Sequence, residues 1–180
     1  DGDGLPEMDQ MAVVGPRLFV SIQRLDRRKG FAPTGPSRLV VIDTTTDRVE
    51  TTITLRGRNA FGDASGIVRE PGGDRLAVAT PGDLYAVEAD AGIEWVNPAT
   101  LASEGFALRE DVVDGNVTDF VLLSATQGYA IVQGRDLTNR VMRFDPSTGA
   151  VVGGPILSRQ GYLPDLAVVG DRVWIADQTR

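Results

Sequence analysis

The amino-acid sequence predicts an all-β fold in which a unit of four antiparallel strands repeats along the chain. Gly (21 residues) and Pro (10) are plentiful and aromatic residues make up only 6% of the chain, a composition that suits short strands joined by many turns. Two short sequence signatures recur in alternation. No amphipathic helical pattern of ten residues is found, and the segment 109–115 is too acidic and too short to form a helix.

The first signature is an apolar strand that ends in Asp or Asn and is followed within three residues by Thr. It occurs three times, and its key positions Asp43, Asn97 and Asp145 are 54 and 48 residues apart. Such a side chain accepts hydrogen bonds from backbone N–H groups two or three residues further on, which closes an Asx-turn. We therefore expect a hairpin at each copy, and a structural role for these residues in preference to a catalytic one.

The second signature is an apolar strand, a tight turn that contains Gly, and a second apolar strand. Residues 12–20 nearly duplicate residues 167–175, and residues 72–78 and 127–132 are degenerate versions. Because two independent signatures interleave in the same order, they define a repeat. The anchor positions of the second signature are 58, 53 and 44 residues apart, at Leu18, Leu76, Tyr129 and Val173.

Together the signatures predict three complete units and the start of a fourth. The expected strands are 9–14, 17–25, 37–43 and 48–55; then 64–70, 74–80, 92–97 and 101–108; then 117–124, 127–133, 139–145 and 150–157; and finally 164–169 and 171–177. Four-stranded units with a period near 50 residues are typical of a β-propeller. We divide the chain into an acidic linker or the end of a preceding blade (1–8), blade 1 (9–63), blade 2 (64–116), blade 3 (117–163) and the start of blade 4 (164–180).

The hairpin segment Val41-Ile42-Asp43-Thr44, with Thr46, Val49 and Thr52-Ile53, resembles the YVTN-type β-propellers, a bacterial family. The later copies, with Asn97-Pro98 and Asp145-Pro146, look equally similar to quinoprotein-type or Kelch-like propellers. The resemblance spans essentially the whole chain, but it implies an architecture and no particular activity. Complete members of such families have six to eight blades, so we expect this chain to supply about half of a ring.

An incomplete ring leaves one face of each end blade bare, and a bare apolar face is poorly tolerated by a monomer. We therefore expect either further blades of the same chain or a second copy to close the ring. Residues 1–7 are too polar and too short to supply the missing strands of the fourth blade, which favours further blades. The first residue is Asp1, so we expect the chain to be a processed or excised piece.

The composition excludes several classes of function. The chain has no Cys and no His, which removes disulfides, thiolate nucleophiles, Ser-His-Asp triads and most zinc and copper sites. A net charge of −7 argues against binding to nucleic acid or to an anionic membrane, and no apolar run is long enough to span a membrane.

Candidate binding residues lie in the loops between the second and third strands, because ligands of propellers bind near the channel mouth and function concentrates in long loops on a rigid scaffold. For any one of these residues, simple surface decoration is an equal alternative. The basic cluster between residues 24 and 29 is interrupted by Asp26, which favours a solvated loop over a phosphate site. The candidates are Arg24, Asp26, Arg27, Arg28, Asp83, Tyr85, Arg135 and Asp136.

The N-terminal segment Asp1-Gly2-Asp3-Gly4-Leu5-Pro6-Glu7 resembles the Asp-rich calcium repeats of bacterial surface proteins. Calcium takes six to eight oxygen ligands, and Asp1, Asp3 and Glu7 are the weak candidates here. The alternative is a flexible acidic linker without a metal. We expect no other cofactor.

These features lead us to expect a non-catalytic β-propeller binding or scaffold module outside the cytoplasm (periplasmic, at the cell surface or a lipoprotein) that presents loops to a protein, peptide or glycan. One alternative is half of a propeller enzyme, a metal-dependent hydrolase or lactonase or a quinoprotein dehydrogenase. Another is a structural spacer in a surface or filament assembly. Carboxylates converging on the channel would favour an enzyme, and a channel mouth lined by Arg and apolar residues would favour binding.

Overall fold

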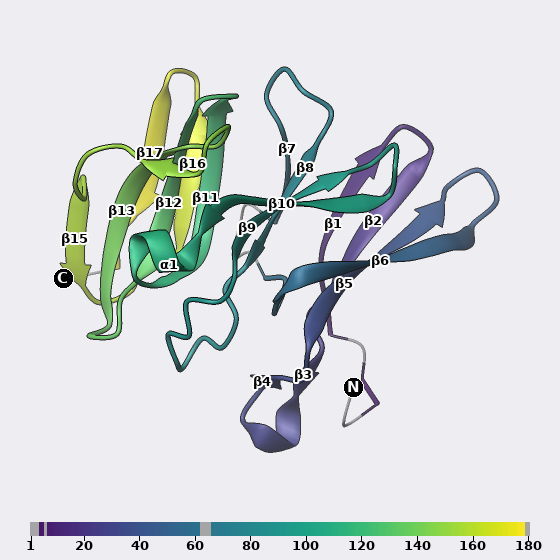
Figure 1. Ribbon diagram of the computed structural model, residues 1–180, viewed down its shortest axis with the longest axis horizontal. Coiled ribbons are helices and arrows are strands. Elements are labelled where there is room, and N and C mark those ends of the chain that lie inside the picture. Colours follow the sequence, from purple (N-terminus) through teal and green to yellow (C-terminus); the bar gives the residue numbers. More distant parts are fainter. Residues whose placement is uncertain (1–3, 6, 62–65, 179–180) are drawn as a thin grey trace.

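The computed structural model describes residues 4–5, 7–61 and 66–178 and has an all-β architecture of antiparallel sheets, as the sequence predicts (Figure 1). In the larger sheets the strands are hydrogen-bonded in their order along the chain, except that the last strand of the third sheet pairs with the third strand of that sheet. Sheet 1 contains β1 (Met8–Val14), β2 (Arg17–Ile22), β5 (Pro36–Asp43) and β6 (Arg48–Arg58). Sheet 2 contains β7 (Ile67–Arg69), β8 (Leu76–Thr80), β9 (Gly92–Asn97) and β10 (Ala102–Arg109).

Sheets 3 and 4 follow the same antiparallel pattern. Sheet 3 contains β11 (Asn116–Ser124), β12 (Gln127–Gln133), β13 (Thr138–Asp145), β14 (Ala150–Val151) and β15 (Leu157–Gln160), and sheet 4 contains β16 (Asp165–Val169) and β17 (Arg172–Ala176). Both β14 and β15 pair with β13, so they act as one interrupted outer strand. The predicted strand 150–157 is broken because Gly153 has a φ of 77°, which an extended strand does not allow.

Two short elements differ from the prediction. Residues Glu110–Val113 form one turn of helix, α1, although the segment 109–115 was expected to be non-helical; the turn ends at Asp114, which has a φ of 47°. The predicted strand 17–25 ends early because Arg24 has a φ of 61°. Beyond it, β3 (Leu25–Asp26), the 3₁₀ helix η1 (Arg27–Lys29) and β4 (Ala32–Pro33) form a small ribbon that projects below sheet 1 in Figure 1.

The three hairpin turns form as the first signature predicts. Asp43 Oδ1 accepts a hydrogen bond from the backbone N–H of Thr45 at 2.7 Å, and Asp145 Oδ1 accepts one from that of Ser147 at 2.9 Å. Asn97 Oδ1 accepts one from Ala99 at 2.9 Å. Hydrogen bonds from the Thr45 and Ser147 side chains and backbones lower the pKa of Asp43 and of Asp145, so both carboxylates stay ionised when they close the turns.

The apolar core consists of three layers, one between each pair of neighbouring sheets. The layers contain Phe19, Leu39, Leu76 and Val96 between sheets 1 and 2; Ile93, Trp95, Phe120 and Phe144 between sheets 2 and 3; and Ile131, Val141, Leu163 and Leu166 between sheets 3 and 4. Trp95 is buried, and the guanidinium of Arg75 lies 4.1 Å from the centre of its ring. Trp174 is 56% exposed, on the outer side of sheet 4.

Buried carboxylates link the sheets as well. Glu94, on β9 of sheet 2, is fully buried and reaches across to β6 of sheet 1. Its two oxygens accept hydrogen bonds from the backbone N–H groups of Arg56, at 2.9 Å, and Gly57, at 3.0 Å, and from the hydroxyl of Ser103. In the same manner, Asp119 Oδ2 on sheet 3 accepts a hydrogen bond from the backbone N–H of Leu166 on sheet 4 at 2.7 Å.

Replacement of Glu94 by Gln should lower the free energy of unfolding by about 2 kcal/mol, because the new amide turns N–H donors toward groups that already donate. Urea denaturation at neutral pH measures the loss. The matched control is Glu104→Gln, which changes an exposed carboxylate on the neighbouring strand and should cost no more than about 0.5 kcal/mol. Equal losses for the two variants would show that Glu94 does not join the sheets.

Candidate binding site at the loop edge

The loops that connect the second and third strands of sheets 1, 2 and 3 emerge at the same end of the stack, which is the lower end in Figure 1. This follows from the strand order, because the strands of each antiparallel sheet run alternately up and down. The loops are residues 23–35, 81–91 and 134–137. We call this end the loop edge.

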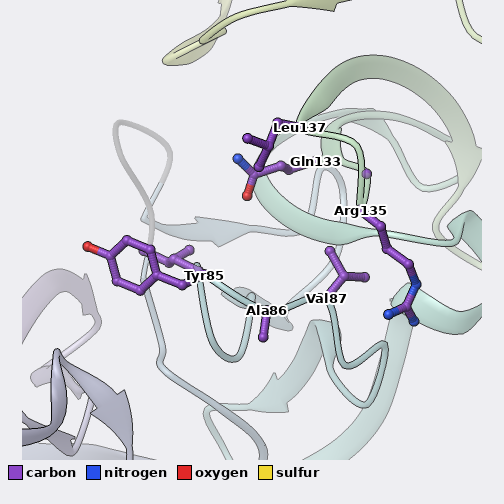
Figure 2. Close-up of a pocket in the computed structure, with 8 residues that line it drawn as sticks. Tyr85, Ala86, Val87, Gln133, Arg135 and Leu137 are labelled. Carbon is purple, nitrogen blue, oxygen red and sulfur yellow. The ribbon is translucent and has the colours of Figure 1, made fainter.

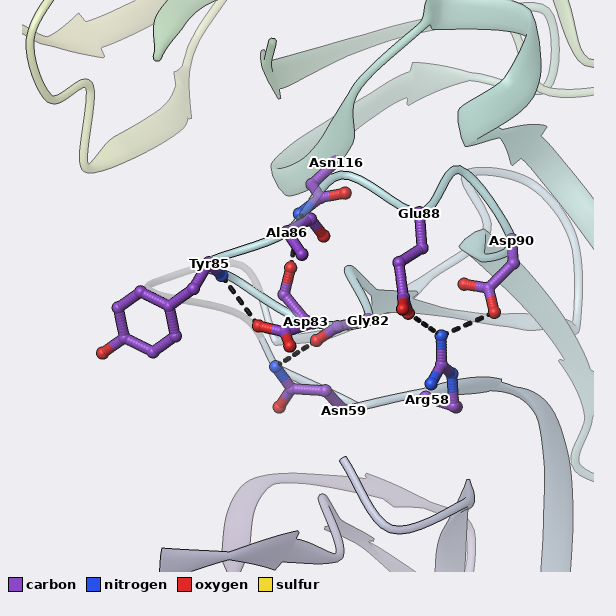
Figure 3. Close-up of polar contacts among 9 residues, drawn as sticks. All are labelled: Arg58, Asn59, Gly82, Asp83, Tyr85, Ala86, Glu88, Asp90 and Asn116. Carbon is purple, nitrogen blue, oxygen red and sulfur yellow. Dashed lines mark hydrogen bonds and ion pairs between the residues drawn. The ribbon is translucent and has the colours of Figure 1, made fainter. Parts of the chain in front are cut away.

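Loop 81–91 is fixed by hydrogen bonds from residues outside it (Figure 3). Asn116, at the start of β11, donates from Nδ2 to the carbonyl oxygens of Asp83 at 2.7 Å and Ala86 at 3.4 Å. Asn59, which follows β6, donates from Nδ2 to the carbonyl oxygen of Gly82 at 2.8 Å. Both asparagines are buried, so these bonds are shielded from water and hold the loop to sheets 1 and 3.

Ion pairs fix the second half of the same loop. Arg58, at the end of β6, forms ion pairs through Nη2 with the carboxylates of Glu88 and Asp90, the latter at 2.6 Å (Figure 3). Within the loop, Asp83 Oδ1 accepts a hydrogen bond from the backbone N–H of Tyr85 at 2.8 Å. The loop is therefore attached at both ends, and the Tyr85 ring points away from the polar network.

A pocket of about 270 Å³ lies between loop 81–91 and loop 134–137 (Figure 2). Tyr85 is 83% exposed and Leu137 is 65% exposed, and both line it. Arg135 and Gln133 provide the polar side chains of its wall. The lining is completed by Leu84, Ala86, Val87 and Gly134.

A second, more polar pocket continues from the first and shares Gly134 and Arg135 with it. The Arg135 Nε lies 4.0 Å from Asp114 Oδ1. Asp136 accepts hydrogen bonds from the backbone N–H of Thr138 at 3.0 Å and from its hydroxyl at 2.8 Å, and these bonds lower the pKa of the Asp136 carboxyl. An ionised carboxylate and a guanidinium therefore flank the mouth of the apolar pocket.

The four candidates of the second and third loops thus divide by role. Tyr85 and Arg135 lie together on the first pocket. The carboxylates of Asp83 and Asp136 accept hydrogen bonds within their own loops and so shape them. The residues that hold loop 81–91 were not among the predicted candidates, because their partners lie far away in the sequence and their burial is evident only in the structure. These residues are Arg58, Asn59 and Asn116.

The four candidates of the first loop line neither of these pockets. Asp26 is buried, and its Oδ1 accepts a hydrogen bond from the backbone N–H of Arg28 at 3.0 Å, which caps η1. Arg24 Nη1 donates to the carbonyl oxygen of Pro36 at 2.9 Å. The side chains of Arg27 and Arg28 are largely exposed, in keeping with a solvated basic loop.

The calcium candidates fall partly outside the described residues, since Asp1 and Asp3 are not among them. Glu7 is buried; its Oε2 accepts a hydrogen bond from the backbone N–H of Leu25 at 3.1 Å, and its Oε1 lies 3.6 Å from Arg27 Nε. Within residues 4–5, 7–61 and 66–178, no three acidic side chains gather closely enough to hold a metal ion.

Loss of the Asn116 side chain should release loop 81–91. We expect Asn116→Ala to accelerate chymotrypsin cleavage after Tyr85 about tenfold, since removal of two partly buried hydrogen bonds makes local opening more frequent. Mass spectrometry of the fragments identifies that cut. Gln127→Ala, which removes a donor to the Tyr129 hydroxyl away from the loop, should leave the rate unchanged. A similar rate for Asn116→Ala and the native chain would contradict the anchoring role.

Comparison with known proteins adds no relative: no family model and no curated protein matches the chain. In the part of the chain that the structure describes, no helix is long and apolar enough to cross a membrane.

Proposed function

We propose that the chain is part of a β-propeller, related in its repeats to the YVTN-type family, and that it acts as a non-catalytic binding module. In this proposal sheets 1, 2 and 3 are blades and sheet 4 begins another. The consecutive strand order within each sheet and the face-to-face packing of neighbouring sheets support the architecture. Contacts of β1 with β7 and of β11 with β16 support an arrangement in which first strands lie side by side, as around an axis.

The observation that carries the binding function is the exposure of Tyr85 on an anchored loop beside an apolar pocket. An exposed aromatic ring on a fixed loop can bury a large apolar surface against a partner. Because the loop is already ordered, little conformational entropy is lost when the partner binds. Tyr also combines an apolar ring with a hydroxyl that can form hydrogen bonds, as in protein interfaces. Of the expected partners (protein, peptide or glycan), the apolar lining favours a side chain of a protein or peptide.

The lining of a second region favours binding over catalysis. A cavity of about 390 Å³ lies beside the first strands of sheets 2, 3 and 4, where a propeller channel would run. Among the described residues that line this cavity, Asp165 alone carries a carboxylate. The enzyme alternative calls for several carboxylates that converge on the channel. The remaining lining is apolar: Val68, Val121, Leu122, Leu166, Ala167 and Val168.

The apolar side chains on the end sheets support completion of the ring by further blades of the same chain or by a second copy. Met11 and Val13 are exposed on β1, and Val169 and Trp174 are exposed on sheet 4. Exposed apolar residues that recur on the two end sheets are what an open arc of blades leaves uncovered. With the acidic charge and the family resemblance, we place this module outside the cytoplasm.

The binding function is tested by screening the purified chain against peptide and glycan libraries. A ligand of the pocket should bind Tyr85→Ala about tenfold or more weakly than the native chain, as expected for an aromatic anchor. Phe31→Ala is the matched control, because Phe31 is also an exposed aromatic residue on a loop but does not line the pocket. If every selected ligand tolerated Tyr85→Ala, or none were selected, the proposed site would be refuted.

The proposed open arc is tested by light scattering and by binding of an apolar dye. We expect the 180-residue chain either to associate or to bind the dye. In the double variant Val169→Thr and Trp174→Gln, association or dye fluorescence should fall by about half, because one of two apolar faces becomes polar. Tyr85→Ala serves as the control. A monomer without dye binding would contradict the arc.

A further inference from the structure

Glu110 forms hydrogen bonds with the end of loop 81–91 and with β11, the strand from which Asn116 anchors this loop. It is the first residue of α1, between β10 and β11, and is only 1% exposed. Its backbone N–H donates to the carbonyl oxygen of Ala91 at 3.0 Å, at the end of loop 81–91. Its side-chain Oε1 accepts a hydrogen bond from the backbone N–H of Val117 at 2.8 Å. One residue thus joins the end of the loop to the beginning of β11.

The strand segment that Glu110 fixes is the one that anchors the loop. Asn116 precedes Val117 directly, and its amide donates to Asp83 and Ala86. The hydrogen bond between Glu110 and Val117 therefore sets the position from which Asn116 reaches the loop. Val117 and Asn116 thus connect the Glu110 carboxyl group to the loop that carries Tyr85.

The surroundings of the second carboxyl oxygen of Glu110 disfavour the ionised form of the side chain. Oε2 of Glu110 is buried and has no hydrogen-bond partner among the described residues. An ionised carboxylate without a compensating partner is costly to bury, whereas a protonated one is tolerated. Burial raises the pKa of Glu110 to about 7; the nearby backbone amides of Val117 and Ala91 act in the opposite direction, and the charge of Asp90 adds to the rise.

The neighbouring cations are occupied by other acceptors. On β6, Arg58 is paired with Glu88 and Asp90, so its weak favourable effect on the Glu110 carboxylate does not offset burial. On β13, Arg140 donates to the carbonyl oxygens of Val113, at 2.9 Å, and Asp114, at 2.7 Å.

On the same segment as Glu110, Arg109 is paired with Asp111 at 2.7 Å. The Asp114 carboxylate is exposed and faces Arg135. Of the other acidic groups, Asp83 accepts a hydrogen bond from the backbone N–H of Tyr85. No cation is therefore placed to neutralise an ionised Glu110 within the described ranges.

We propose that protonation of Glu110 holds loop 81–91 in place and that its ionisation loosens this loop, so that the binding site of the proposed function is firm in mildly acidic conditions and mobile in mildly alkaline ones. Only the effect on ligand binding rests on the proposed function; the pH dependence of the loop does not. The protonated form needs no cation. The ionised form is relieved when the 110–117 segment opens to water, which moves Asn116 away from its two carbonyl partners.

The sign of the pH dependence follows from the raised pKa. The folded chain holds the proton up to about pH 7, while an unfolded or opened chain releases it near the ordinary value of 4.5. The closed state is therefore favoured at pH below 4.5 and loses this advantage progressively as the pH rises to 7 and beyond.

Hydrogen exchange of the native chain, followed by mass spectrometry at pH 6 and pH 8 and corrected for intrinsic exchange rates, tests the proposal without any ligand. We expect protection of amides in 82–91 to fall about tenfold from pH 6 to pH 8, since opening is coupled to release of the Glu110 proton until the pH passes the raised pKa of about 7. In Glu110→Gln, which stays neutral and keeps an oxygen for Val117, protection should be equal at the two values. Glu104→Gln should behave as the native chain.

Two outcomes overturn the proposal. One is equal protection of 82–91 at both pH values in the native chain, and the other is an undiminished pH effect in Glu110→Gln. The variant Asn116→Ala tests whether the anchor on β11 controls the loop. It should lower the protection of amides in 82–91 at both pH values. Because no ligand takes part, failure of the library screen leaves this result unaffected, and the two proposals fail separately.

Discussion

The packing of sheets 1 and 2 depends on the buried carboxyl group of Glu94, whose oxygens accept hydrogen bonds from backbone N–H groups of the neighbouring sheet. Apolar layers allow sheets to slide over one another, because hydrophobic burial has no direction. A buried carboxyl group has one position in which its oxygens meet hydrogen-bond donors, and in every other position they are unpaired. Glu94 therefore fixes β6 over sheet 2, and β6 in turn carries Arg58 and Asn59 to the loop edge.

The position of the exposed loop 81–91 at the loop edge depends on this packing of the sheets. Tyr85 makes few contacts of its own, yet its place is determined by donors that arrive from β6 and β11 on either side of sheet 2. A shift of either neighbouring sheet would break the hydrogen bonds that Asn59 or Asn116 donates to carbonyl groups of loop 81–91. The site is thus a product of the packing of three sheets, although only two loops form the pocket wall.

The sequence predicted the strands well because their signals are local. The Asx-turns at Asp43, Asn97 and Asp145 and the Gly-containing turns carry their own chemistry within a few residues, and they identify the hairpins. The site was predicted only in part. Tyr85 and Arg135, which line the pocket, were singled out because they lie in loops between second and third strands, whereas Asn59, Asn116 and Glu110 act between segments far apart in the chain.

Every sheet here is made from strands that follow one another in the sequence, and this has a consequence for how the chain is made. Sheet 1 has all of its residues as soon as Arg58 has been synthesised, and later sheets can add to it in turn from the N-terminus. A series of such sheets can also lengthen by duplication of one continuous stretch of gene, without any change in the strand order of the earlier sheets. The nearly duplicated segments 12–20 and 167–175 are what such a history would leave behind.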